Sequence, residues 1–180
     1  MSKENKFETN AIHVGNKPDS STGSISPPIH LTSTYVQDGI GKNKGFDYSR
    51  GTNPTRERLE KNIASLEGGH DAIAFSSGMA ATTALLQHLK QGDHIIISRN
   101  VYGGTYRMTT QVLSNHGLKF DFVDTTDAQN IKEAIKPETK WVFIETPTNP
   151  MLEVTDIAAV SKICKAVSYT HLRAHETLRY

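Results

Sequence analysis

Apolar residues in the middle of the chain recur at helical spacing first and in short runs afterwards. Leu59 and Ile63 are spaced as on one face of a helix. Asn53 can cap that helix, Pro54 suits its first position, and Gly68 can end it. The sequence therefore predicts that regular structure begins near residue 53.

Beyond this helix, the pattern alternates between short apolar runs and helical segments. The predicted strands are Ala72–Phe75, His94–Ser98, Phe120–Val123 and Trp141–Glu145. The predicted helices are Gly78–Lys90, Thr105–His116, Asp127–Lys136 and Asp156–Ala166. Such alternation is typical of an α/β fold with a mostly parallel sheet and helices on both faces. The strand ends should then meet at one edge, where such sheets bind ligands. They lie near Ser76, Ser98, Asp124 and Glu145.

The two ends of the chain lack this pattern. Residues 1–52 carry Pro18, Pro27 and Pro28 and no sustained periodicity, so we expect an extended arm with little regular structure of its own. The apolar residues scattered through it favour an arm laid against another surface over a disordered one. Residues 167–180 are polar where another buried strand should follow, and we interpret them as a non-family tail of artefactual origin. A genuine amphipathic helix is the alternative there.

Composition narrows the class of protein. Among 180 residues, 36% are hydrophobic and 22% charged, with a net charge of +1, so nothing favours nucleic acid as a partner. Cys164 has no second cysteine with which to pair, which fits a reducing compartment. No apolar run reaches the ~20 residues that cross a bilayer, and the first residues are polar. We expect a cytoplasmic protein that has neither a membrane nor a metal as partner.

One candidate site lies where a predicted strand runs into a helix at Ser76-Ser77-Gly78. The first amides of that helix and its dipole can bind an anion, and Gly78 allows a phosphate to approach closely. No G-x-G-x-x-G, Walker loop or G-x-S-x-G motif is present. A purely structural helix cap is equally compatible with these residues.

Two further candidate segments combine tyrosine with arginine. Tyr48 and Arg50 stand two apart in a stretch predicted to be extended, so both side chains should point the same way and could clamp a phosphate. Tyr102 precedes two glycines at the ligand edge, where its ring could lie flat on a planar ligand. Arg107 follows Gly103 by one helical turn and could meet a substrate carboxylate. A solvated loop and a common turn are the alternatives.

A fourth candidate segment, Glu145–Pro150, follows the last predicted strand. Asn149 stands between Thr148 and Pro150, with a second proline at 147, so its backbone is restricted and its amide is free to donate to a ring substituent.

Taken together and in this order, the four segments resemble the Cys/Met metabolism family of pyridoxal-5'-phosphate (PLP) enzymes. This family includes cystathionine γ-synthase, γ-lyase and β-lyase, methionine γ-lyase and O-acetylhomoserine sulfhydrylase. The segments read YSRGTNPTRERLE, SSGMAA, YGGTYR and ETPTNP, and the resemblance runs from about Thr9 to about Val167. It implies part of the large domain of an aspartate aminotransferase-like, fold type I transferase, covering 53–166.

The resemblance also implies roles for individual residues. The backbone amides of Gly78 and Met79, with Ser77 beside them, would bind the PLP phosphate. Tyr102 would stack on the pyridine ring and assist proton transfer, which makes it the catalytic residue of this chain. Asn149 would bond the cofactor's 3'-oxygen.

The remaining implied roles concern the substrate and a second subunit. Tyr48 and Arg50 would reach the PLP phosphate of a neighbouring subunit, so residues 1–52 would be an inter-subunit arm in a homodimer or tetramer. Arg107 and Glu145 would bind the substrate, a sulfur amino acid. The family's Schiff-base lysine has no counterpart in 1–180, so we expect this chain to be an inactive fragment.

Two positions distinguish family members within this resemblance. Position 104 is glycine where methionine γ-lyases typically carry cysteine, and Arg107 is common in cystathionine γ-synthases and γ-lyases. We therefore prefer one of these two reactions at the γ-carbon of a homoserine-derived amino acid. Two alternatives of other classes remain, a nucleotide- or methyl-donor-binding α/β domain and a non-catalytic protein that kept the cofactor cradle.

Overall fold

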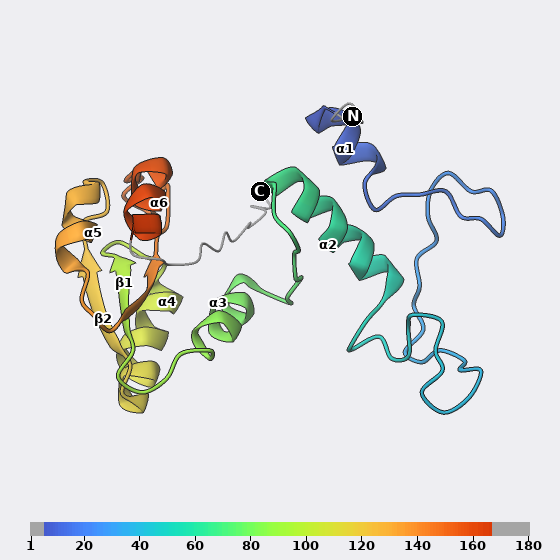
Figure 1. Cartoon of the computed structure of the whole chain (residues 1–180), viewed down its shortest axis with the longest axis horizontal. Coiled ribbons are helices and arrows are strands. Elements are labelled where there is room, and N and C mark those ends of the chain that lie inside the picture. The colour runs from blue at the N-terminus through green and yellow to red at the C-terminus, as the bar shows by residue number, and fades with distance from the viewer. Residues whose placement is uncertain (1–5, 167–180) are drawn as a thin grey trace. The chain divides into compact units, whose positions relative to one another are not determined.

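The structure, a computed structural model, describes residues 6–166 of the chain (Figure 1). It forms two compact units, of which the first ends at Ala74 and the second begins at Phe75. The predicted functional division into an arm, 1–52, and a binding domain, 53–166, stays a prediction. The predicted tail, 167–180, lies outside the described residues.

The first unit contains two helices, α1 (Phe7–His13) and α2 (Pro54–Glu67). The second of these was predicted from sequence, and its ends are confirmed. The Asn53 side chain accepts a hydrogen bond from the amide of Thr55 at 2.8 Å. At the other end, Gly68 adopts the left-handed conformation that closes a helix. Helix α1 corrects our expectation that regular structure would begin near residue 53, although most of the described part of 1–52 is irregular, as expected.

Helix α1 is held by the side chain of Asn62 on α2. The Asn62 amide donates to the carbonyls of Asn10, Ala11 and Val14 at 3.1, 3.2 and 2.9 Å. The two hydrogens of this amide are shared among three carbonyls at the end of α1, of which that of Asn10 also accepts from the amide of Val14. A short helix with no buried residue is thereby fixed to its neighbour.

The second unit is built on three parallel strands, β1 (His94–Ser98), β2 (Lys119–Val123) and β3 (Thr139–Phe143). Their order is β2-β1-β3, so β1 lies in the centre and is buried along its whole length. The parallel sheet and the positions of all three strands, to within two residues, are as the sequence predicted. A fully buried parallel strand is apolar on both faces, which explains the run of isoleucines in β1.

Helices cover both faces of this sheet. Ile95 and Ile97 pack on one side with Leu86 of α3 (Gly78–Leu86), and Met108 joins the same cluster. Ile96 faces the other side, where it packs against α5 (Ala128–Ala134) and α6 (Ile157–Ala166) through Ile131, Val160 and Cys164. The predicted α/β architecture, with successive residues of β1 supplying two cores, is confirmed.

One predicted strand does not exist. Residues 71–75 form no regular structure, and Ile73 and Phe75 are exposed. Both sides of β1 are already paired, and the amide of Ala74 bonds the carboxylate of Glu60 at 2.9 Å rather than a neighbouring strand. The apolar run was therefore a wrong indication, because residues 72–75 pair with none of the three strands of the sheet.

The predicted helix Thr105–His116 is irregular. It begins earlier, as α4 (Gly103–Arg107), and continues as a π-helical turn, Met108–Val112, and a 3-10 turn, Leu113–His116. The hydroxyls of Thr109, Thr110 and Ser114 donate to carbonyls of the preceding turn. Such bonds compete with the regular helical pattern, which accounts for the widened turn. The other helices are as predicted but end up to four residues earlier.

Substituting Gly15 should destabilise the first unit. Gly15 has φ of +77°, and a Cβ there would lie directly against the backbone carbonyl of Arg58. We expect Gly15→Ala to lower the free energy of unfolding by about 2–3 kcal/mol, from strain and collision together. Gly23 is the matched control, because its φ is +75° and nothing lies within 4 Å of its Cβ position. Equal losses in chemical denaturation of the two variants would contradict the collision.

His94 should make the sheet sensitive to acid. Its side chain is fully buried, with Nδ1 2.8 Å from Thr139 Oγ1. Nε2 lies 3.3 Å from an Asp121 carboxylate oxygen but is not aligned for a hydrogen bond. Burial lowers the pKa of His94 below its usual 6.5, so the unfolded chain takes up the proton first.

Stability contributed by neutral His94 is therefore complete above pH 6.5 and is lost as the pH falls through the lowered folded pKa. Denaturation at about pH 7.5 and about pH 5.5 should show a smaller acid loss in His94→Gln than in the parent. The exposed His116 supplies the control, His116→Gln, which should keep the parent's loss. An undiminished acid loss in His94→Gln would rule out this account.

Candidate functional site

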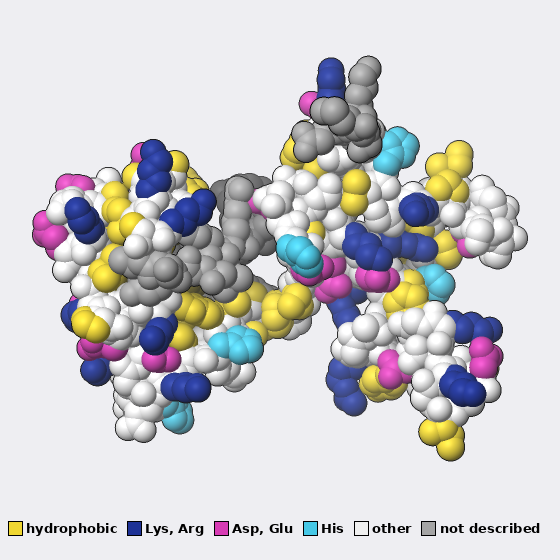
Figure 2. Space-filling view, viewed as in Figure 1, with side chains coloured by type: hydrophobic (Ala, Val, Ile, Leu, Met, Phe, Trp, Pro, Cys, Tyr) yellow, Lys and Arg dark blue, Asp and Glu magenta, His cyan; other side chains and the backbone are white. Residues whose placement is uncertain are grey.

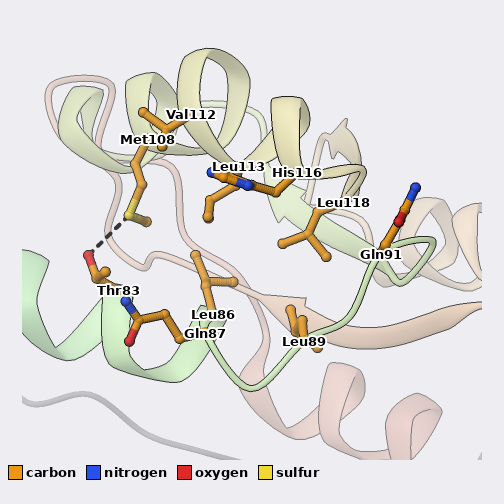
Figure 3. Close-up of a pocket in the computed structure, with 10 residues that line it drawn as sticks. All are labelled: Thr83, Leu86, Gln87, Leu89, Gln91, Met108, Val112, Leu113, His116 and Leu118. Carbon is orange, nitrogen blue, oxygen red and sulfur yellow. Dashed lines mark hydrogen bonds between the residues drawn. The ribbon is translucent and has the colours of Figure 1, made fainter.

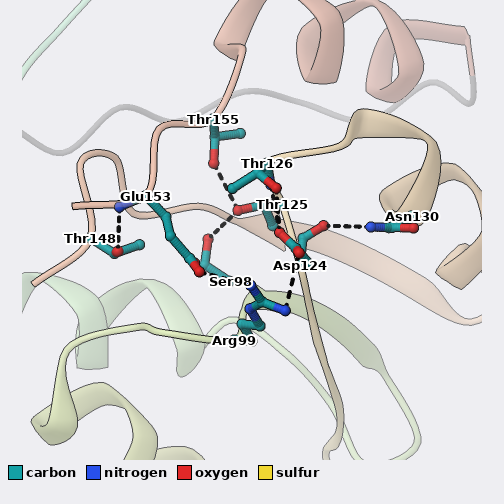
Figure 4. A network of polar contacts seen from close by, with 9 residues as sticks. All are labelled: Ser98, Arg99, Asp124, Thr125, Thr126, Asn130, Thr148, Glu153 and Thr155. Carbon is teal, nitrogen blue, oxygen red and sulfur yellow. Dashed lines mark hydrogen bonds and ion pairs between the residues drawn. The ribbon is translucent and has the colours of Figure 1, made fainter. Parts of the chain in front are cut away.

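The carboxyl ends of the strands are joined by a chain of buried hydroxyls. Ser98 Oγ, at the end of β1, lies 3.1 Å from Thr125 Oγ1, which lies 2.7 Å from Thr155 Oγ1 (Figure 4). Ser98 Oγ also accepts a hydrogen bond from the amide of Glu145 at 3.1 Å. The predicted gathering of Ser98, Asp124 and Glu145 at one edge is therefore confirmed, whereas Ser76 follows no strand.

Charged groups at the same edge are already paired. Arg99 contacts Asp124 at 3.0 Å and Glu153 at 2.8 Å, as Figure 4 shows for the first of these pairs. The hydrogen bond from Arg99 lowers the pKa of the Glu153 carboxyl, so this group stays ionised over a wider pH range. Arg99 therefore links the 145–155 segment to Asp124 at the end of β2.

Glu145 connects two of the sequence-predicted loops. Its Oε2 accepts from the amide of Tyr102 at 2.8 Å, and its Oε1 accepts from the amide of Asn149 at 3.4 Å. The carboxylate thus brings together residues more than forty positions apart in the sequence. Tyr102 and Asn149 were each predicted as site residues, and the structure places their backbones on opposite oxygens of one side chain.

Helix α3 begins beside this pair of loops with two unused amides. Ser77 Oγ accepts from the amide of Ala80 at 3.1 Å and so caps the helix. Within residues 6–166, the amides of Gly78 and Met79 have no protein acceptor. The Ser77 hydroxyl can still donate its own hydrogen. The start of α3 therefore offers three donors and a positive dipole end to an anion.

The Tyr102 ring is held close to the start of α3. A Cβ added at Gly104 would lie 2.5 Å from Tyr102 Cε1 and 3.0 Å from Met79 Sδ. The ring and the methionine therefore share the space above this glycine, while about half of the tyrosine, 53%, remains exposed. The Arg107 guanidinium lies back over Gly103, with Nη1 3.3 Å from the position of a Cβ there.

The Asn149 loop is closed by Thr148. The Thr148 hydroxyl accepts from the amide of Glu153, and the Thr148 amide donates to the Glu153 carbonyl, both at 3.0 Å. The peptide bonds before Pro147 and Pro150 are cis. In the described part of the chain, the side-chain amide of Asn149 has no hydrogen-bond partner, so it is free to bind a ligand.

Tyr48 and Arg50 belong to the first unit, whose placement relative to the second is not described. The Arg50 guanidinium lies 5.0 Å from the centre of the Tyr48 ring, so the two side chains do share one side. The predicted reason was wrong, because the segment is a turn in which the amides of Gly51 and Thr52 both donate to the Tyr48 carbonyl. Arg56 holds this turn through the carbonyls of Ser49 and Gly51.

A separate hollow of about 400 Å³ lies between α3 and the irregular helix that follows β1 (Figure 3). Its lining is mostly apolar, and Thr83 and Met108 meet across it at 3.1 Å. None of the sequence-predicted site residues lines it. Among residues 6–166, no cluster of three metal-ligating side chains occurs, and no helix there is long and apolar enough to cross a bilayer.

The sequence analysis did not identify the buried threonines that connect the strand ends at this edge. Thr125 and Thr155 are buried at 4% exposure, yet no periodicity or motif distinguishes them from ordinary loop threonines. The one available signal was that polar residues follow three apolar runs that were predicted as strands. The link from Glu145 to Tyr102 gave no local signal, because it depends on which loops the sheet brings together.

Similarity to known proteins identifies the family. The model of the family described as "Cys/Met metabolism PLP-dependent enzyme" matches residues 8–176. This match extends into residues 167–180, which we expected to be a non-family tail. The chain is 47% identical over 159 residues to "Probable cystathionine gamma-synthase" of Herpetosiphon aurantiacus, covering 88% of this chain and 50% of that protein. It is 49% identical over 160 residues to the cystathionine beta-lyase of Lactococcus lactis subsp. cremoris, covering 89% and 42%.

A solved structure agrees with these relatives. The cystathionine gamma-lyase of Lactobacillus plantarum, complexed with L-serine, superimposes with a TM-score of 0.86 at 46% identity and covers 92% of this chain and 43% of that one. The chain therefore spans half or less of the length of the proteins that it matches. By the extent and identity of these matches, the chain belongs to the Cys/Met metabolism family of PLP-dependent enzymes.

Proposed function

We propose that the protein carrying this chain acts on the γ-carbon of a homoserine-derived amino acid, as a cystathionine γ-synthase or a cystathionine γ-lyase. Family membership and relatives that carry these names support the proposal. Gly104 and Arg107 favour it over methionine γ-lyase and O-acetylhomoserine sulfhydrylase, the alternatives within the family. A relative named as a beta-lyase keeps cleavage at the β-carbon as a further alternative.

The structural observation that supports a PLP site in this chain is the carboxylate of Glu145, whose two oxygens bond the amides of Tyr102 and Asn149 at the sheet edge. PLP is the family's cofactor, and the residues here fit its shape and charge. The amides of Gly78 and Met79 would bind the phosphate with the Ser77 hydroxyl. The half-exposed Tyr102 ring would lie on the pyridine ring. The free amide of Asn149 would donate to the ring oxygen.

When bound, PLP supplies an electron sink for carbanion chemistry at the substrate's carbon atoms. The chain's own residues then bind and orient. We propose that the Tyr102 hydroxyl holds or passes a proton beside the cofactor, because its phenol stands exposed at the edge while its backbone is fixed. Arg107, which makes no ion pair with the described residues, would attract a substrate carboxylate.

We propose that residues 1–52 contact a second subunit, in a homodimer or a tetramer of two dimers. Apolar side chains are exposed along this segment, as the surface of the unit with α1 and α2 shows in Figure 2. The most exposed of them are Ile25, Ile29, Leu31, Val36 and Ile40. Tyr48 and Arg50 would then reach the phosphate site of the neighbour, and the assembly would be cytoplasmic.

We further propose that the 180 residues alone are inactive. The family's cofactor-binding lysine lies in a Ser-x-Thr-Lys context, and no lysine of this chain has that context. Lys162 and Lys165, on α6, follow no serine–threonine pair of that kind. Without such a lysine, the 180 residues lack the side chain that binds the cofactor covalently and carries protons between the reacting carbons in this family.

The reaction can be decided by products, with the protein at the length of its relatives. A γ-lyase converts cystathionine and water to cysteine, 2-oxobutanoate and ammonia, whereas a β-lyase gives homocysteine, pyruvate and ammonia. A γ-synthase forms cystathionine and succinate from O-succinylhomoserine and cysteine. We expect one of the two γ-reactions, and the 180-residue chain should catalyse neither. Pyruvate as the main product, or activity with neither substrate, would refute the assignment.

Gly104→Ala should weaken cofactor binding, because the new methyl group would collide with the Tyr102 ring. We expect a PLP dissociation constant about tenfold higher, from the cost of overpacking. Gly103→Ala is the matched control, since its methyl group would meet only the flexible end of Arg107. Absorbance titration of cofactor-free protein at full length measures both. Equal dissociation constants for Gly104→Ala and the parent would show that the ring does not stack on PLP.

A further inference from the structure

We infer that Glu145 is a positioning residue, whose carboxylate sets the Tyr102 loop and the Asn149 loop at a fixed separation. This inference rests on the proposed function, in which the two loops hold one ring between them. It replaces our sequence-based expectation that Glu145 binds the substrate. The carboxylate would act on the cofactor through the loops that it holds and would not touch the reacting atoms.

The first support is the division of the two carboxylate oxygens. Oε2 accepts from the amide of Tyr102 at 2.8 Å, and Oε1 accepts from the amide of Asn149 at 3.4 Å. Hydrogen bonds to an ionised acceptor are stronger than neutral ones, and the shorter one here holds the first residue before α4. Tyr102 has no side-chain cap of its own, so this carboxylate takes the place of a helix-capping group.

The second support is the rigidity of the base from which the carboxylate extends. The Glu145 amide donates to the buried Ser98 hydroxyl, which continues through Thr125 to Thr155. The amide of Thr155 returns to the hydroxyl of Thr146, one residue beyond Glu145. The backbone on both sides of Glu145 is therefore anchored to the strand ends. The three hydroxyls that form this network, those of Ser98, Thr125 and Thr155, are all buried.

The third support is that each loop exposes a side chain that can bind a ligand. The Tyr102 ring stands half exposed above Gly104, and the side-chain amide of Asn149 has no partner among the described residues. A flat ring stacked on the first and bonded by the second requires both at once. A shift of about 1 Å in either loop is enough to lower binding or rate strongly, so a single side chain that fixes both is an efficient arrangement.

The test compares three variants of the protein at full length. Glu145→Gln leaves one oxygen to accept and turns an amide group toward the other loop. Glu145→Asp keeps the charge but is one methylene too short to reach both amides. Glu138→Gln is the matched control, because Glu138 is a carboxylate that pairs with Lys119 at the amino ends of the strands, away from both loops.

Hydrogen exchange of the Tyr102 and Asn149 amides, measured without cofactor, reports the positioning directly. Both Glu145 variants should exchange about tenfold faster there, and Glu138→Gln should exchange as the parent does. Exchange in His94–Ser98 should stay slow in all of them, which shows that the sheet is intact. If Glu145→Gln fails to fold, Glu145→Asp carries the test. Unchanged exchange at Tyr102 overturns the inference.

Titration with PLP separates this inference from the proposed function. The dissociation constant should rise about tenfold in the Glu145 variants and stay constant in Glu138→Gln. Faster exchange with an unchanged dissociation constant overturns the inference, because the loops would then be held for another purpose. Parent protein whose PLP affinity is insensitive to Asn149→Ala and Tyr102→Ala would instead refute the proposed site, whatever the exchange data show.

Discussion

The parallel pairing of β1 with a strand on each side is the constraint on which the rest of this structure depends. Because β2 and β3 both run in the direction of β1, the residues after all three strands emerge at one edge. Ser98, Thr125 and Glu145 meet there although the sequence separates them widely. The buried isoleucines of β1 stabilise this pairing by packing on both helical layers, at about 1.5–3 kcal/mol for each buried side chain.

At the carboxyl edge of the sheet, some polar groups are paired within the protein and others are left to bind a ligand. Buried hydroxyls bond one another, so none of them is left without a partner in an apolar setting. Arg99 pairs with the carboxylates of both Asp124 and Glu153, so its guanidinium is already engaged within the protein. The donors left over are the first amides of α3 and the side chains of Tyr102, Arg107 and Asn149. An anionic, planar cofactor offers the complement to this remainder.

The local features of the fold could be predicted from the sequence. Asn53, Pro54 and Gly68 mark α2 by their own conformational preferences, and the apolar run of β1 indicates a buried strand. The strand predicted at Ala72–Phe75 was wrong, because a short apolar run does not by itself show whether its backbone pairs with another strand. The helix after Tyr102 was misjudged because threonine hydroxyls, whose partners depend on the fold, widen it.

Sequence motifs indicated single residues of the candidate site but not the contacts between them, because those contacts depend on the fold. Short motifs indicated Gly78, Tyr102 and Asn149 one by one, and the family resemblance assigned their roles. The contact between Glu145 and Tyr102 spans 43 positions and follows from strand order alone, so no motif could indicate it. Tyr48 and Arg50 meet as expected, yet through a turn that the sequence did not suggest.

A crystal structure of the full-length protein with PLP tests the central claim most directly. The account predicts phosphate oxygens within hydrogen-bonding distance of the amides of Gly78 and Met79, with the Tyr102 ring parallel to the pyridine ring and the Asn149 amide on its oxygen. A phosphate bound elsewhere, with the start of α3 facing only water, would contradict it.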